Sequence, residues 1–288
     1  MKLSVNITNY SWADGAVARG LGGLAAAIDD TGLDTVWVTD HLLQADPSST
    51  FGAEMLEAYT TLGYLAARTE RVRLGAMVSP VTYRAPSLLI KEVTTLDVLS
   101  EGRAWLGLGA GYHEEEARAM GLSLPPVGQR FEALEETLIL AKQMFRGDTA
   151  PFVGHQYRLD NPISNPRPAT QPHPPILIGG AGERETLRLV AQYADACNLF
   201  DIPDGGVTIR RKLDVLADHC EHVGRSVSEI EKTVSTRLNR GESSESFADR
   251  LLTLAELGIE HAVVITDHAF VDSDLTTLAR TAEAVRSR

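Results

Sequence analysis

Short apolar runs alternate with longer, helix-like segments along the whole sequence, and this alternation limits the possible folds more than any other feature. Several runs are apolar almost throughout, which is typical of strands buried on both faces of a parallel sheet. The segments between them are amphipathic, and many end at a glycine, as helices often do. Eight strand–helix pairs favour a (β/α)8 TIM barrel, an α/β fold, with a doubly wound open sheet as the alternative. The expected strands are 2–8, 35–40, 72–79, 103–111, 175–180, 195–200, 231–238 and 261–266.

One segment interrupts the alternation. Residues 148–175 are rich in proline and polar residues and lie between the expected fourth helix and fifth strand. Long ordered loops in compact domains are usually functional, so this insertion is expected near the active site. Barrels of this length often form one domain, so residues 1–288 are expected to be a single domain. The expected helices include 20–32, 58–70, 87–102, 131–147, 246–258 and 274–288.

The charge balance limits the classes of partner. Lys and Arg number 27 against 39 Asp and Glu, a formal net charge of −12. Nucleic acids and anionic membranes both need a basic face, so the expected partner is a small-molecule substrate and neither of those. The two cysteines, Cys197 and Cys220, lack metal-site spacing and fit a reducing compartment. The chain start lacks a signal-peptide core and no apolar run reaches membrane-spanning length, so a cytoplasmic location is expected.

Polar residues follow several expected strands, at the end where a TIM barrel forms its active site. Histidine titrates near neutrality and an adjacent carboxylate can orient it, so Asp40 and His41 are candidate catalytic residues for proton transfer. Adjacent strand residues point to opposite faces, so only one of the two can face inward unless the strand has ended. The alternative is a helix cap by Asp40 beside a structural histidine. The other polar or aromatic residues at strand ends include Asn6, Thr8, Phe200, Asp201, Asp267 and His268.

No metal site is expected. The acids and histidines at these strand ends are too scattered to define a ligand set, and the first strand lacks the His-x-His pattern of many metal hydrolases on this fold. Redox chemistry is therefore favoured over metal catalysis.

The stretch WLGLGAGYHEEE (105–116) has a glycine at every second position of its first half. A dinucleotide fingerprint needs G-x-G-x-x-G, and the match fails because Tyr112 stands at the third glycine position. One interpretation is that small residues fill the tapered barrel interior. The other is that Gly109 and Gly111 keep the barrel mouth open for a planar ring, with Tyr112 and His113 at its rim.

A second glycine-rich stretch, ILIGGAGERETLRLV (176–190), has the pattern of a strand, a glycine loop and a helix. Backbone N–H groups at a helix start favour phosphate, and glycine lets the anion approach. Arg184 and Arg188 add positive charge, whereas Glu183 and Glu185 count against binding by charge alone. The alternative is an ordinary strand-to-helix turn whose acids complement the helix dipole.

Together these motifs resemble those of the luciferase-like flavin oxidoreductase superfamily, in the subgroup that uses the 5-deazaflavin coenzyme F420. The resemblance follows the family order and covers nearly the whole chain. It departs at Tyr112, where the family often has tryptophan, and at DACN (195–198), where it often has DGWN; neither removes a group with obvious chemistry. The matching stretches are VWVTDHL (36–42), residues 72–103, LGLGAGYHEEE (106–116) and residues 174–198.

The resemblance implies roles for individual residues. The cofactor ring would lie over the fourth-strand edge GLGAG (107–111), and the loop after the fifth strand would hold the phosphate. His41 matches a position near the ring that is often assigned a proton-transfer role. Val78 and Ser79 match a third-strand bulge behind the ring, where members often have a non-prolyl cis peptide, here Met77–Val78. The expected cofactor contacts are Asp40, Met77, Val78, Ser79, Gly109, Gly111, Tyr112, His113, Gly179, Gly180, Ala181, Gly182, Glu183 and Arg184.

The implied activity is hydride transfer between coenzyme F420 and a small organic substrate, because a deazaflavin passes two electrons as hydride and reacts poorly with oxygen. The alternatives are a flavin mononucleotide (FMN) monooxygenase that activates oxygen and a barrel that only binds the cofactor. A homodimer is also expected. The motifs do not define the substrate, which loop side chains select.

Overall fold

The computed structural model describes residues 1–12, 15–46 and 49–287. Its main sheet runs in the order β3-β2-β1-β11-β10-β9-β8-β5-β4, and all these pairs are parallel. Backbone hydrogen bonds from Leu74 to Arg103 (2.8 Å) and from Trp105 to Leu74 (2.8 Å) close it into a barrel. With β3 and β4 taken as one interrupted strand, the (β/α)8 prediction is confirmed. The strands are β1 (Lys2–Ile7), β2 (Thr35–Val38), β3 (Arg73–Ala76), β4 (Ser79–Pro80), β5 (Leu106–Gly109), β8 (Ile176–Gly179), β9 (Ala196–Phe200), β10 (Glu231–Arg237) and β11 (His261–Ile265).

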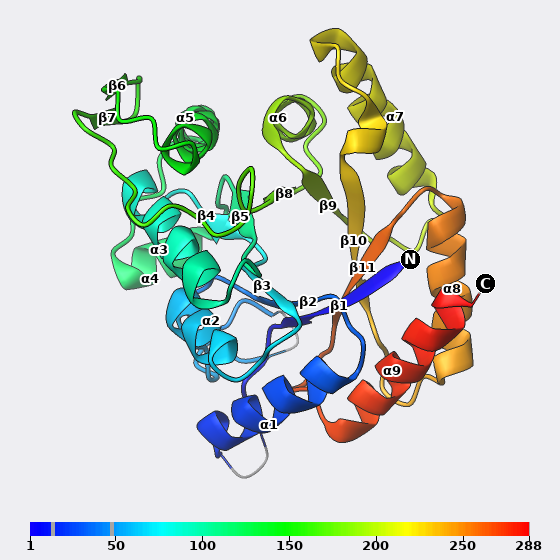
Figure 1. The fold of residues 1–288 in the computed structure, drawn as a ribbon. Coiled ribbons are helices and arrows are strands. Elements are labelled where there is room, and N and C mark those ends of the chain that lie inside the picture. Colours follow the sequence, from blue (N-terminus) through cyan, green and yellow to red (C-terminus); the bar gives the residue numbers. More distant parts are fainter. Residues whose placement is uncertain (13–14, 47–48, 288) are drawn as a thin grey trace.

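Helices surround this sheet (Figure 1). The expected helix 20–32 begins earlier, at Val17, and the expected helix 274–288 begins at Asp272; its last residue, 288, lies outside the described residues. No helix in the described part of the chain is long and apolar enough to cross a membrane. The barrel helices are α1 (Val17–Asp30), α2 (Ala58–Ala66), α3 (Pro86–Leu99), α5 (Val127–Phe145), α6 (Thr186–Tyr193), α7 (Val207–Val223), α8 (Ser244–Glu256) and α9 (Asp272–Arg286), with additional short helices α4 (Glu114–Met120) and η1 (Val227–Glu229).

The third strand is interrupted. The sequence predicts one strand over 72–79, whereas the structure has β3 and β4 separated by Met77 and Val78. The peptide between these two residues is cis, as the family resemblance implies. On one side of the interruption β3 pairs with β2, and on the other β4 pairs with β5. Leu74 of β3 also bonds to Arg103 and Trp105, which precede β5, so the interruption lies within one barrel strand that has neighbours on both sides.

The insertion 148–175 packs on the outer helices. It contains an antiparallel pair, β6 (Phe152–Val153) and β7 (Arg158–Leu159). The Glu136 carboxylate on α5 accepts backbone N–H groups of the connecting turn, Tyr157 among them at 2.9 Å. Asp97 on α3 accepts the backbone N–H of Thr170 at 2.8 Å. These contacts anchor the segment to α3 and α5, and its expected proximity to the active site stays a prediction.

Alternation along the strands separates two cores. Leu3, Val5 and Ile7 of β1 belong to the large apolar cluster that includes the surrounding helices. A smaller cluster fills the barrel interior around Trp37 and Trp105, whose rings lie 5.5 Å apart.

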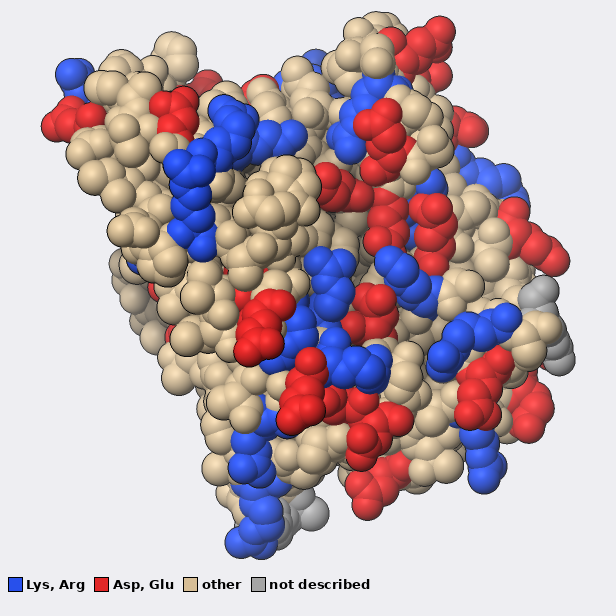
Figure 2. Space-filling view, in the orientation of Figure 1, with Lys and Arg blue, Asp and Glu red and all other residues tan. Residues whose placement is uncertain are grey.

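On the outside, in the view of Figure 2, Lys and Arg side chains lie beside Asp and Glu and do not form one continuous basic patch.

A buried polar chain joins three strands at their N-terminal ends. Ser4 Oγ contacts His261 Nε2, and His261 Nδ1 lies 2.9 Å from Glu231, which also pairs with Lys2 at 3.1 Å. Burial acts to raise the pKa of the Glu231 carboxyl, but the contacts with His261 and Lys2 outweigh it and lower the pKa to about 2. Because the opposite end of a TIM barrel holds the active site, this row of polar contacts has a structural role.

We expect Glu231→Gln to lower the free energy of unfolding by about 1–3 kcal/mol near pH 7, because a charged hydrogen bond to buried His261 is lost. The folded pKa of Glu231 lies below its unfolded value, so its contribution is present above about pH 4.5 and is lost as the pH falls toward about 2. Urea unfolding at about pH 7 and about pH 3.5 should therefore show a narrowing gap between the two proteins. Asp160→Asn, at an exposed ion pair, is the control and should change stability by less than about 1 kcal/mol. A gap that widens at low pH would contradict this assignment.

Candidate active site

A cavity of about 640 Å³ opens at the C-terminal ends of the barrel strands. Its walls come from β1, β2, the interruption after β3, and the ends of β5, β8, β9, β10 and β11. This is the end at which the sequence placed the site. The expected site residues that line it are His41, Met77, Val78, Gly109, Gly111, Tyr112, Gly179, Gly180, Ala181 and Gly182.

One wall of the cavity is Val78 backed by glycines. A Cβ atom on Gly107 would overlap the carbonyl oxygen of Ala76. A Cβ on Gly109 would lie 2.8 Å from the Val78 side chain, and one on Gly179 would lie 2.9 Å from it. These glycines therefore let the interrupted third strand lie directly against β5 and β8. This packing agrees with the interpretation that small residues fill the barrel end. The other interpretation, that Gly109 and Gly111 keep the mouth open for a planar ring, stays a prediction.

His41 faces the cavity with its ring held from behind. Its Nδ1 lies 2.6 Å from the carboxylate of Glu116, which comes from α4, 75 residues further along the chain. The expectation that the adjacent Asp40 orients His41 is therefore wrong. Since Nδ1 is used, Nε2 is the ring nitrogen left for the cavity. Tyr112 lines the same cavity, with its ring centroid 5.9 Å from that of His41 and its side chain largely exposed.

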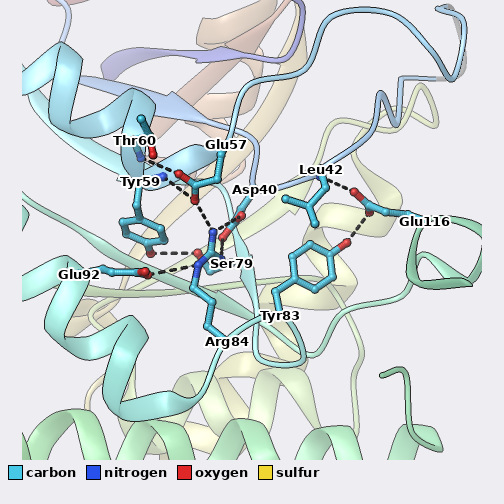
Figure 3. A network of polar contacts seen from close by, with 10 residues as sticks. All are labelled: Asp40, Leu42, Glu57, Tyr59, Thr60, Ser79, Tyr83, Arg84, Glu92 and Glu116. Atoms are coloured by element: carbon cyan, nitrogen blue, oxygen red, sulfur yellow. Dashed lines mark hydrogen bonds and ion pairs between the residues drawn. The ribbon is translucent and has the colours of Figure 1, made fainter. Parts of the chain in front are cut away.

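Glu116 is buried and receives several hydrogen bonds. The backbone N–H groups of Leu42 and Leu43 donate to it at 2.5 Å and 3.0 Å, and the Tyr83 hydroxyl donates as well (Figure 3). Burial acts to raise its pKa, but the hydrogen bonds from His41 and Tyr83 outweigh burial and lower the pKa to about 2. Sequence reasoning missed this residue. The signal was present, since three glutamates follow His113 at the end of a barrel strand.

Asp40 and Ser79 point away from the cavity. The Asp40 carboxylate binds the Arg84 guanidinium through two hydrogen bonds, at 2.6 Å and 3.1 Å, and its side chain is fully buried. Arg84 also pairs with Glu57 at 2.6 Å and with Glu92 at 3.2 Å (Figure 3). Ser79 is buried beside this cluster, with its hydroxyl 3.0 Å from that of Tyr59. Asp40, which follows β2, thus binds Arg84, which follows β4, and links the ends of the two strands. The adjacent His41 faces the cavity.

The loop after β8 contains the glycines Gly180 and Gly182, which would let an anion approach its backbone. The negative charge of Glu183, which counted against anion binding in the sequence, is paired with cations of α7. Gly180 has a φ of +109°, and a Cβ on Gly182 would lie 2.9 Å from the Thr186 hydroxyl oxygen at the start of α6. Glu183 pairs with Lys212 at 2.7 Å and with Arg211 at 2.9 Å, so α7 neutralises its charge.

Three further residues that were expected to contact the cofactor, Glu183, Arg184 and His113, do not line the cavity. Glu183 and the exposed Arg184 are not among the lining residues. His113 caps α4 and accepts the Glu116 backbone N–H at 3.1 Å. Its ring stacks on Phe51 at 6.3 Å outside the cavity. The structure therefore does not place these three residues, or Asp40 and Ser79, where they would touch a ligand in the cavity.

A second wall is polar, and the sequence pointed to Asn6 and Asp201 as strand-end residues but missed those of β10. It contains Asn6 of β1 and the last residues of β10, Ser235, Thr236 and Arg237, with Asp201 after β9. The Thr236 hydroxyl donates to Asp201 at 2.7 Å. The three β10 residues are consecutive, so strand alternation alone does not identify them as a group.

Comparison with known proteins agrees with this geometry. A sequence profile described as luciferase-like monooxygenase matches residues 1–286. The chain is 31% identical over 220 residues to an F420-dependent glucose-6-phosphate dehydrogenase of Nakamurella multipartita, covering 76% of this chain and 63% of that protein. It is 30% identical over 253 residues to the protein of that name from Kineococcus radiotolerans, covering 84% and 69%.

One solved structure shares the fold over almost its whole length. An F420-dependent secondary alcohol dehydrogenase in complex with an F420-acetone adduct superposes with a TM-score of 0.83 at 16% identity, covering 99% of both chains. With the profile match over residues 1–286, the sequence and the fold lead to one conclusion: this chain belongs to the luciferase-like monooxygenase family.

Proposed function

We propose that this chain is an oxidoreductase that transfers hydride between the deazaflavin coenzyme F420 and a small organic substrate. The observation that carries the proposal is a cavity lined both by Val78, which glycines back, and by a histidine whose ring a buried carboxylate holds. The two relatives at 30% and 31% identity are both named as F420-dependent, which supports the choice of cofactor.

The residues of the cavity fit such a cofactor. The wall formed by Val78, Gly109 and Gly179 carries no polar side chain, as the face under a flat ring requires. Gly180 and Gly182 leave backbone accessible before the N-terminus of α6, where a phosphate is favoured. When bound, the deazaflavin supplies a carbon that accepts or donates hydride. The chain itself would bind the ring, orient it and exclude water.

His41 is the proposed proton carrier. Glu116 is ionised because its pKa is about 2, so its carboxylate accepts and His41 Nδ1 must donate. In the neutral ring Nε2 is then an acceptor that faces the cavity. It can take the proton that a hydroxyl group loses when the carbon beside it gives up hydride, and return that proton in the reverse direction. Glu116 is the positioning residue, because it acts through His41.

An FMN-dependent monooxygenase is the second candidate, since the family takes its name from such activity. A barrel that only binds its cofactor is the third. The homodimer and the cytoplasmic location expected from the sequence stay predictions, for light scattering and cell fractionation respectively.

Calorimetric titration tests the choice of cofactor. The unsubstituted protein should bind oxidised F420 more tightly than FMN. Gly182→Val should weaken F420 binding, because the new side chain would crowd Thr186 and cover the backbone of the loop. Gly128→Val is the control, since a Cβ there meets nothing within 4 Å. Binding of FMN without binding of F420 would replace the proposal with the second candidate, and full affinity in Gly182→Val would remove the phosphate role.

Substitution at His41 tests the proton transfer. His41→Ala should lower kcat by about 10²–10⁴-fold, while the dissociation constant for F420 changes far less. Glu116→Gln should also lower kcat and change its pH dependence, because the amide no longer requires Nδ1 to donate. F420 absorbance can follow turnover with glucose 6-phosphate and with propan-2-ol, substrates of the kinds named for the relatives. If His41→Ala loses cofactor binding and keeps kcat at saturation, His41 only positions the cofactor.

A further inference from the structure

Asn6 is a buried side chain on the cavity wall whose amide oxygen has no hydrogen-bond partner. Its exposed fraction is 5%, and its Oδ1 is one of nine buried side-chain polar atoms without a hydrogen bond among the described residues. Asn6 is the residue of that group that lines the cavity. Buried polar groups in proteins are normally paired, so an unpaired one in a binding cavity points to a ligand.

Two other polar side chains that line the cavity are already paired within the protein. Asn198 donates to Thr233 at 2.9 Å and accepts from Ser235 at 2.9 Å, so both ends of its amide are paired. Thr39 donates its hydroxyl to the carbonyl of Ile7 at 3.1 Å. The buried amide oxygen of Asn6 therefore differs from the polar atoms of Asn198 and Thr39 on the same cavity wall.

Strand alternation explains why Asn6 faces inward. In β1 the residues Leu3, Val5 and Ile7 pack outward against the helices, so Ser4 and Asn6 face the barrel interior. Ser4 lies deeper and has His261 as its partner. Asn6 lies opposite Trp37 in the β1–β2 register, just below the strand end that leads to His41.

We propose that Asn6 is a specificity-determining residue that receives a hydroxyl group of the substrate. This inference rests on the proposed function, because it assigns the polar half of the same cavity to the substrate. A hydroxyl can both donate and accept, so it can pair with either end of the Asn6 amide that turns toward the cavity. An alcohol or polyol is therefore the substrate class, in preference to an alkane or another molecule without hydroxyl groups. The hydroxyl at Asn6 lies in the cavity that His41 also faces.

The stability of two matched variants separates this role from a structural one. Asn6→Leu and Asn6→Ala remove an unpaired group, so both should keep or raise the Tm. Asn198→Leu leaves the Thr233 and Ser235 hydroxyls without their partner and should lower the Tm by about 2–8 °C. If both Asn6 variants lower the Tm as much as Asn198→Leu does, Asn6 is structural and the inference is overturned.

Saturation-transfer NMR on the cofactor-free protein tests the ligand class. Glycerol should receive saturation from the unsubstituted protein, and 1,2,3-trimethoxypropane, which has the same carbon chain without hydroxyl donors, should not. In Asn6→Leu and Asn6→Ala the affinity for glycerol should fall by about 3- to 10-fold. Equal glycerol binding in these variants, or none in the unsubstituted protein, overturns the inference. Because no cofactor is present, Asn6-dependent glycerol binding in a protein that binds neither F420 nor FMN would overturn the proposed function alone.

Discussion

The close approach of the interrupted third strand to β5 and β8 is the constraint on which the rest of the site depends. At Gly107 a Cβ would overlap the carbonyl oxygen of Ala76, and at Gly109 and Gly179 it would crowd Val78. Those glycines therefore allow the interrupted strand to lie directly against β5 and β8. The wall of the cavity formed by Val78 follows from this close approach, while the hydrogen bonds between Leu74 and residues 103 and 105 close the barrel.

The carboxylates of Asp40 and Glu116, both near His41, have different roles because they have different hydrogen-bond partners. Asp40 binds Arg84 and fixes the ends of β2 and β4 relative to each other. Glu116 is held by backbone N–H groups and by Tyr83, and its lowered pKa keeps it an acceptor for His41. Separating these tasks lets the histidine ring keep one orientation, because its carboxylate partner is itself fixed from several sides.

The two ends of the barrel interior differ in how their polar groups are paired. At the N-terminal end Ser4, His261 and Glu231 satisfy one another, which suits a region whose role is to hold strands together. At the C-terminal end Asn6 is left unpaired beside a cavity of about 640 Å³. A protein that leaves a buried amide oxygen unpaired gives up some stability, and a ligand that pairs with it recovers that stability on binding.

The sequence by itself determined the barrel, its strand order, the end that holds the site and the family. The periodicity of apolar residues and the glycines that end helices are patterns between residues close together in the sequence. The strands and helices of the barrel can therefore be predicted without knowing the tertiary structure. The sequence also determined that glycines at 109 and 179 mattered, but the tertiary structure alone showed that Val78 is the group they accommodate. The tertiary structure alone also showed the role of Glu116, which lies 75 residues from His41 in the sequence. The two residues meet because α4 follows β5 at the same end of the barrel at which His41 follows β2. Asp40 is adjacent in sequence yet faces Arg84, because successive residues at a strand end point in opposite directions. Which side chains share a cavity, and which of them lack a partner, is decided by distances between segments far apart in the chain, and no local pattern encodes those distances.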